Sequence, residues 1–167
     1  MTQAIRFSLN GTAREVQVPA GSRLIDVLRD ELDATSSKKA CGIGRCGACM
    51  VLRNGTPANA CLLMMWQVEG ADIVTPEGLD AVPDSVFVRQ GLTEENAFQC
   101  GYCAPGFTVT LTALLRDVAS PTEADIREAL SGNLCRCTGY HSIIRGALRA
   151  ADLKQADSRA GAPDSLA

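Results

Sequence analysis

Hydrophobic and polar residues alternate at the start of the chain, on both sides of an Asn10-Gly11 pair. The alternating apolar positions are Ile5, Phe7, Leu9, Val16 and Val18. A period of two places successive side chains on opposite faces of a strand, and Asn-Gly favours a tight hairpin turn. The pattern therefore predicts an opening β-hairpin.

A helix, a second hairpin and a short strand are predicted next. Ser22 is suited to cap a helix. The apolar face of that helix consists of Leu24, Ile25, Val27, Leu28 and Leu32. Asn54-Gly55 separates the strand-like segment 50–53 from a segment that ends at Cys61, which indicates another hairpin. Residues 71–74 form the last predicted strand.

The period changes from two to three or four after residues 75–84, which are rich in proline and glycine. Apolar helix positions are Phe107, Leu111, Leu114 and Leu115, then Ile126, Ala129 and Leu130, then Ile143, Ile144, Ala147, Leu148 and Ala151. The spacing predicts three helices, and a fourth is expected over 85–92, where Gly91 costs about 1 kcal/mol relative to Ala. Residues 154–167 are small and polar, which predicts a disordered tail.

Composition narrows the class of protein. The 167 residues are 46% hydrophobic and 21% charged but only 4% aromatic, so aliphatic side chains must form most of the core. A net charge of −3 gives no reason to expect nucleic acid or an anionic membrane surface as a partner. No apolar run reaches transmembrane length, and residues 1–9 lack a secretory signal. We therefore expect a cytoplasmic protein whose cysteines stay reduced.

Eight cysteines form two sets of four. In the first set, four residues separate Cys41 from Cys46, two separate Cys46 from Cys49, and Cys61 follows at a distance. This is the spacing of plant-type 2Fe-2S ferredoxins. Structural zinc remains an alternative, although its usual pattern is two short Cys pairs across a longer gap.

The second set comprises two close pairs far apart in the chain. Cys100 and Cys103 form the first pair, and Cys135 and Cys137 form the second. On spacing alone this set suits either zinc or an iron–sulfur cluster. Bringing the pairs together requires packed helices, which the second half of the chain is predicted to supply.

Three ordered motifs give these cysteines a context. They are Cys41-Gly-x-Gly-x-Cys46-Gly-x-Cys49, Gln99-Cys100-Gly-Tyr-Cys103-x-Pro105-Gly106, and Gly132-Asn-Leu-Cys135-Arg-Cys137-Thr-Gly-Tyr140. From Ile5 to about Leu153 the chain resembles the small iron–sulfur subunit of molybdenum hydroxylases, the xanthine dehydrogenase family. Ala104 departs from the threonine that is common there, which affects no ligand.

The resemblance implies an α+β fold with two domains. Residues 1–79 would form a β-grasp, ferredoxin-like domain with one 2Fe-2S cluster, and residues 80–153 an all-α four-helix domain with the other. All eight cysteines would be ligands. Gln99 and Cys137 would face the pterin of a molybdenum cofactor held by a large partner subunit.

The function implied is electron transfer. Electrons would run from molybdenum to the second cluster, then to the first, and on to an FAD-binding subunit or another acceptor. The chain itself carries no motif for substrate binding or catalysis. A free-standing two-cluster ferredoxin and a zinc protein remain the alternative interpretations.

Overall fold

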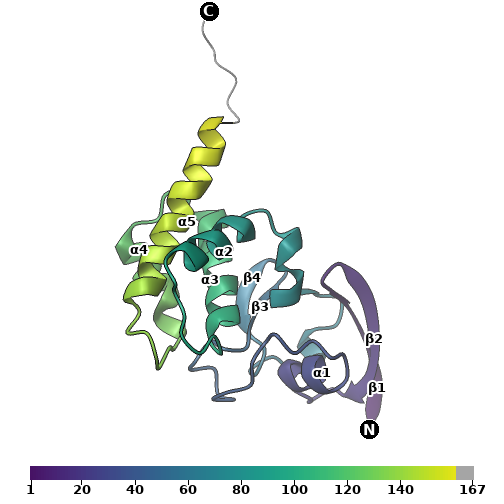
Figure 1. Ribbon diagram of the computed structural model, residues 1–167. Helices are drawn as coiled ribbons and strands as arrows, with labels where there is room; N and C mark the ends of the chain where they lie inside the picture. The colour runs from purple at the N-terminus through teal and green to yellow at the C-terminus, as the bar shows by residue number, and fades with distance from the viewer. Residues whose placement is uncertain (161–167) are drawn as a thin grey trace, which may run out of the picture.

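The computed structural model describes residues 1–160, in which a mixed β-sheet lies beside a group of helices (Figure 1). The strands are β1 (Thr2–Leu9), β2 (Thr12–Pro19), β3 (Met50–Arg53), β4 (Thr56–Asn59) and β5 (Asp72–Val74). The α-helices are α1 (Leu24–Asp30), α2 (Ser85–Glu94), α3 (Ala104–Asp117), α4 (Glu123–Ala129) and α5 (His141–Ala160). The predicted α+β class is confirmed. None of the helices in this part of the chain is long and apolar enough to cross a membrane.

The sheet has the strand order β2-β1-β5-β3-β4, with β1 and β5 parallel and the other neighbours antiparallel. The predicted opening hairpin is confirmed: Leu9 pairs with Thr12, and Asn10 and Gly11 take φ values of 52° and 76°. Helix α1 contributes its apolar face to the core of this half. Arg23 precedes α1 as its cap and no side chain caps it, so the expectation for Ser22 was wrong.

The helices of the second half enclose a separate core around the fully buried Phe107. Helix α4 begins at Glu123, where the Thr122 side chain accepts from the N–H of Asp125 in a capping box. Helix α2 forms despite Gly91. A Cβ on Gly91 would lie 2.6 Å from the backbone nitrogen of Ala150, so this glycine permits α2 and α5 to pack closely.

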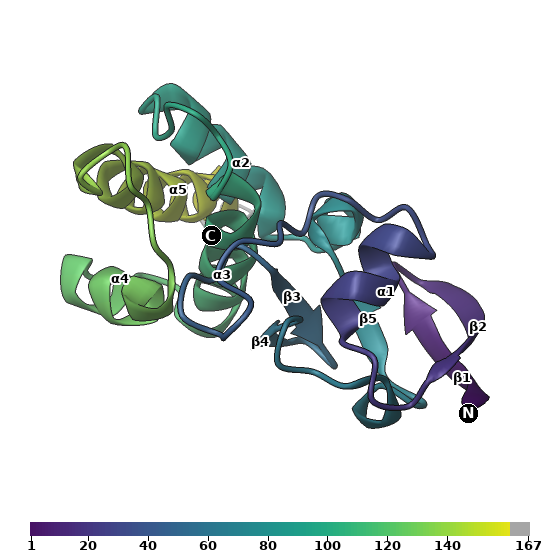
Figure 2. The same cartoon turned by 90° about the horizontal axis from the view of Figure 1, so that it is seen from below.

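The two halves pack directly on each other. A third apolar cluster joins Met50 and Leu52 of β3 to Val109 and Ala113 of α3 and also includes Leu79. Leu79 belongs to a 3-10 helix (Pro76–Ala81) in the segment that connects the halves. Seen from below, the loop that follows α1 crosses from the sheet toward α3 (Figure 2). This loop carries three of the eight cysteines.

Helix α5 is longer than the sequence indicated. It continues to Ala160 and projects from the body of the molecule (Figure 1). Residues 154–160 of the predicted tail are therefore helical, because small and polar residues do not exclude a helix that has already been nucleated. Residues 161–167, the rest of that predicted tail, lie outside the described residues.

Candidate metal centres

The first four cysteines come from one loop and the end of a hairpin. Residues 41–49 lie between α1 and β3, and Cys61 lies two residues beyond β4. The backbone N–H of Arg45 donates to Cys41 Sγ at 3.3 Å, and the backbone N–H of Gly44 donates to Cys61 Sγ at 3.3 Å. Such donors stabilise a thiolate, which is the form of cysteine that binds metal.

The path of this loop requires glycine. Gly42, Gly44 and Gly47 have φ values of 68°, 75° and 66°, a region that residues with a Cβ rarely adopt. A Cβ on Gly47 would also lie 2.6 Å from the carbonyl oxygen of Gly132, which belongs to the other half of the chain. The loop is therefore left-handed at three points and packed closely at two of them, Gly44 against the Leu62 side chain and Gly47 against the other half.

The thiols of the first set form two neighbouring pairs. Hydrogen bonds, from the N–H of Ile43 above all, lower the pKa of the exposed Cys41 to about 6, and the Cys46 side chain contributes. Burial raises the pKa of Cys49 to about 12, and Cys61 and Cys46 add to the rise. These interactions group Cys41 with Cys46, and Cys49 most strongly with Cys61. Metal binding must displace the proton of the buried Cys49.

The second four cysteines also converge in pairs. Cys103 precedes the first residue of α3, and Cys135 and Cys137 lie in the loop before α5. Cys137 Sγ lies 3.6 Å from Cys100 Sγ, and this contact raises the pKa of Cys137. Burial raises the pKa of Cys103 to about 12, with a further contribution from Cys135. Cys100 is thus paired with Cys137, and Cys103 with Cys135.

Two side chains that the sequence analysis assigned no role hold the loop around Cys135. The Tyr140 hydroxyl accepts from the Cys135 N–H at 3.0 Å and donates to the Asn133 carbonyl at 3.2 Å. Burial tends to raise the pKa of Cys135, but hydrogen bonds outweigh it and lower the pKa, chiefly one from the Thr138 hydroxyl at 3.2 Å. Thr138 and Tyr140 belong to the third sequence motif, next to its two cysteines, and this position was the signal that could have indicated their role.

The two cysteine sets meet at an interface between their loops. The backbone N–H of Leu134 donates to the carbonyl oxygen of Cys46 at 2.9 Å. Gly106, in the first turn of α3, faces the backbone of Gly47 so closely that a Cβ would lie 3.0 Å from the Gly47 carbonyl carbon. We call these contacts the loop interface. Cys46 of the first set therefore takes part in a backbone contact with the loop of the second set, and Cys135 directly follows its partner Leu134.

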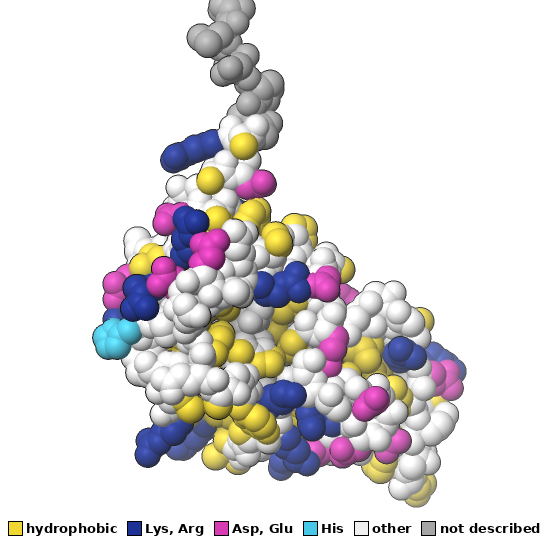
Figure 3. Space-filling model, viewed as in Figure 1, with side chains coloured by type: hydrophobic (Ala, Val, Ile, Leu, Met, Phe, Trp, Pro, Cys, Tyr) yellow, Lys and Arg dark blue, Asp and Glu magenta, His cyan; other side chains and the backbone are white. Residues whose placement is uncertain are grey.

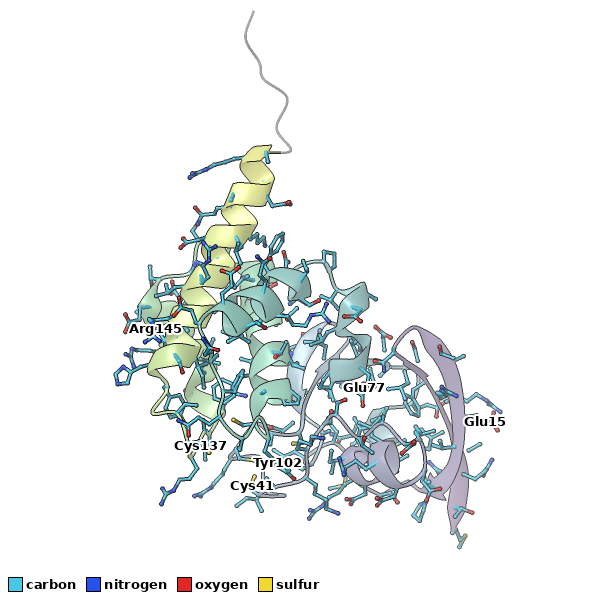
Figure 4. All side chains as sticks on the ribbon, in the orientation of Figure 1. Glu15, Cys41, Glu77, Tyr102, Cys137 and Arg145 are labelled. Carbon is cyan, nitrogen blue, oxygen red and sulfur yellow. The ribbon has the colours of Figure 1, made fainter. Side chains whose placement is uncertain are left out.

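Exposure differs strongly among the predicted site residues. Cys41, Cys100 and Cys137 are exposed, as is Gln99, whereas Cys49, Cys61 and Cys103 are buried and Cys46 and Cys135 are intermediate. Figure 4 shows Cys41, Tyr102 and Cys137 along the same lower edge of the molecule. The Tyr102 hydroxyl donates to the carbonyl of Lys39 at 2.9 Å and so connects the two cysteine loops there.

The paired thiols fit a binuclear cluster. A 2Fe-2S cluster takes four thiolates, two on each iron, and each set of four cysteines contains neighbouring thiols. The glycine-rich backbone and its N–H donors to sulfur also suit a negatively charged cluster.

Comparison with protein families supports this fit. Residues 7–72 match the 2Fe-2S iron-sulfur cluster binding domain, and residues 75–148 match a second 2Fe-2S binding domain. The fold, the paired cysteines and these two matches define a protein with two 2Fe-2S clusters.

Individual relatives narrow the class further. The chain is 46% identical to a probable xanthine dehydrogenase subunit of Bacillus subtilis, over 88% of this chain and 84% of that one. It is 42% identical to the nicotinate dehydrogenase small FeS subunit of Eubacterium barkeri, over 86% of this chain and 94% of that one. The chain belongs to the family of 2Fe-2S iron–sulfur subunits of molybdenum hydroxylases, and its function is electron transfer within such an oxidoreductase.

Solved structures agree with this assignment. Quinoline 2-oxidoreductase from Pseudomonas putida 86 contains a chain with a TM-score of 0.84 and 32% identity, over 93% of this chain and 97% of that one. Aldehyde oxidoreductase from Desulfovibrio desulfuricans gives a TM-score of 0.85 at 35% identity, again over 93% of this chain but only 17% of the other. The matched region is thus a small part of a much longer chain there.

Proposed function

We propose that this chain carries electrons from a molybdopterin centre in a large partner subunit through its second 2Fe-2S cluster to its first, and on toward FAD or another acceptor. One observation carries the proposal: the loops of the two cysteine sets contact each other, and each set also reaches the surface. Leu134 N–H and the Cys46 carbonyl join them, Cys41 is exposed in one set, and Cys100 and Cys137 are exposed in the other. This arrangement suits a carrier with separate input and output sides.

In this proposal every cysteine is an iron ligand, and each neighbouring pair shares one iron. The pairs are Cys41 with Cys46, Cys49 with Cys61, Cys100 with Cys137, and Cys103 with Cys135. Residues 1–79 form a β-grasp domain around the first cluster, and residues 80–153 form a four-helix domain around the second. The five-stranded sheet with α1, and the grouping of α2 to α5 around a separate core, support this division.

The input side is the exposed edge that holds Gln99 and Cys137. Gln99 directly precedes Cys100, whose sulfur lies 3.6 Å from that of Cys137, so both predicted pterin contacts lie on one side of the second cluster. The molybdenum cofactor of the large subunit would supply substrate oxidation and deliver the electrons. The side chain of Gln99 would hydrogen-bond the pterin, and Cys137 would be the iron ligand that lies nearest to the pterin.

The output side is the exposed surface around Cys41. Ile43, Leu62 and Trp66 are 62%, 54% and 60% exposed, which is unusual for large apolar side chains. Residues 34–68 contain four basic side chains and no acidic one. Figure 3 shows hydrophobic and basic side chains gathered along the lower face of the molecule. We propose that an FAD-binding subunit or another acceptor docks here through a surface of its own that has an apolar centre and acidic residues around it.

Purification of the native complex tests the assignment. A tagged chain isolated from its source cells should bring down a large subunit that contains molybdenum and pterin, and should itself hold four irons. We expect this complex in the cytoplasm, where thiols remain reduced. Recovery of the chain without a pterin-bearing partner would contradict the proposal.

A paired substitution tests the input side. Gln99→Ala should weaken binding of the chain to the large subunit about tenfold, because a buried polar group of the partner would lose its hydrogen bond. Gln17→Ala changes another exposed glutamine, on β2, and serves as the control. Equal affinities for both variants, measured by titration calorimetry, would remove Gln99 from the interface.

A further inference from the structure

Asn59 lies beside the first set of cysteines and contacts the sulfur of one of them. It is the last residue of β4 and is partly buried. Its carboxamide oxygen lies 3.7 Å from Cys49 Sγ and accepts from the thiol, while its amide nitrogen donates to the Gly44 carbonyl at 3.4 Å. The Asn59 side chain therefore links the buried Cys49 to the glycine-rich loop at Gly44.

Iron binding changes what this contact requires. When Cys49 binds iron it loses its proton, and the resulting thiolate can only accept hydrogen bonds. A carboxamide oxygen facing an anionic sulfur is unfavourable, whereas a rotation by half a turn presents the NH₂ group instead. The two ends of the carboxamide have nearly the same shape, so the rotation needs no extra space. It gives up a long, neutral hydrogen bond and leaves the carboxamide oxygen facing the Gly44 carbonyl, but it gains a hydrogen bond to a charged sulfur, which is about twice as strong as a neutral one.

The other sulfurs of the first set have backbone donors. The N–H of Arg45 serves Cys41, and the N–H of Gly44 serves Cys61. Within residues 1–160, Asn59 is the one side chain besides the cysteines that hydrogen-bonds a sulfur of this set. It is consequently the position at which a substitution can change the hydrogen bonding of the cluster while leaving the backbone of the loop intact.

We propose that in the loaded protein Asn59 donates a hydrogen bond to the Cys49 thiolate and thereby raises the reduction potential of the first cluster. The proposal rests on Cys49 being a ligand of that cluster. Reduction adds one electron, received from the second cluster, and no proton; the reduced cluster is therefore more negative. A donor aimed at its sulfur stabilises the reduced form more than the oxidised form. Asn59 thus favours transfer of electrons from the second cluster to the first.

Redox titration of the purified complex tests the proposal, with the two clusters distinguished by electron paramagnetic resonance. Asn59→Leu keeps a similar volume but has no donor. It should shift the one-electron reduction equilibrium of the first cluster about tenfold toward the oxidised form, a fall of about 59 mV. The second cluster, in the same molecule, should keep its potential. Thr56→Val, on the same strand, is the matched control and should change neither cluster.

Asn59→Asp provides a second test should the leucine variant fail to hold its cluster. Aspartate has the same shape but presents only acceptors and a negative charge, so it should lower the first potential further than leucine. The proposal is overturned when either variant retains four irons and an unchanged first potential, or when both clusters shift equally. Cys49→Ser addresses the underlying ligand role separately, because a normal first cluster in that variant would refute the ligand assignment itself.

Discussion

Gly106→Ala tests whether the loop interface holds the two cysteine sets together. Gly106 lies in the first turn of α3, three residues after Cys103, and faces the loop of the first set. A Cβ there would lie 3.0 Å from the carbonyl carbon of Gly47 and 3.2 Å from the Cα of Ala48. Both neighbours are backbone atoms of a loop that must keep its shape to bind iron. Neither can move aside as a flexible side chain would.

The expected cost follows from these distances. Carbon atoms in ordinary contact lie about 3.5–4.0 Å apart, and the carbonyl oxygen of Gly47 would lie closer still to this Cβ, so α3 and the loop must separate by roughly 1 Å. Overpacking of this kind costs about 1–3 kcal/mol, and a rigid neighbour places it at the upper end. Alanine in place of glycine returns up to about 1 kcal/mol of helix propensity. The net destabilisation should be about 2 kcal/mol, or about 4–8 °C in unfolding temperature for a chain of this size.

Thermal unfolding followed by circular dichroism and by visible absorbance measures both consequences. The absorbance of the clusters should disappear at a lower temperature than in wild type, along with the helical signal. Gly132→Ala is the control, because a Cβ at that nearby glycine would meet nothing within 4 Å. The reasoning is refuted if Gly106→Ala unfolds with the wild-type midpoint, or if the Gly132 variant loses as much stability.

Three further substitutions probe individual contacts. Hydrogen bonds from Thr75 and Ser36 lower the pKa of Glu77 despite its burial. The stability that the Glu77 carboxylate contributes is therefore present above about pH 4.3, the pKa of an unfolded glutamate. It is lost as the pH falls through the lower pKa of the folded state. Glu77→Gln should therefore unfold in less urea than wild type at pH 7, with a difference that narrows below about pH 4; a constant difference would contradict this. Tyr140→Phe should cost about 1–2 kcal/mol in urea unfolding, because the Cys135 N–H loses its acceptor, and an unchanged midpoint would refute that role. Gly91→Ala should lower the unfolding temperature although alanine favours helix, because its Cβ would meet α5; a rise would show that the helices can separate freely.

Local patterns were sufficient to predict much of the fold. The alternation of apolar residues around Asn10-Gly11 correctly predicted the first hairpin. The change in the spacing of apolar residues after residue 84 correctly predicted the helical half. Positions that depend on distant contacts were less accessible. Gly91 looked unfavourable in a helix because its partner, the backbone near Ala150, lies some sixty positions away in the sequence. Ser22 looked like a cap, but the chain enters α1 through Arg23 instead.

The candidate sites divide in the same way. Spacing predicted the three-cysteine loop and the two close pairs, because cysteines a few residues apart must lie close in space. Which thiols neighbour each other could not be inferred, since Cys100 meets Cys137 only after α3 and α4 have packed. The hairpin that brings Asn59 opposite Met50 was predicted, but the contact of its side chain with Cys49 was not. The ligand roles and the domain limits at residues 79 and 153 stay predictions.

The loop interface limits how freely the two halves can be exchanged. Family members of known sequence invite chimaeras, in which the sheet half of one protein is joined to the helical half of another. Gly47 and Gly106 are matched to each other at backbone distance, and Leu134 completes the fit by bonding to the carbonyl of Cys46. A chimaera that takes these residues from different parents would place unmatched surfaces against each other beside both metal centres. Successful grafts should therefore transfer the two loops and the first turn of α3 as one unit.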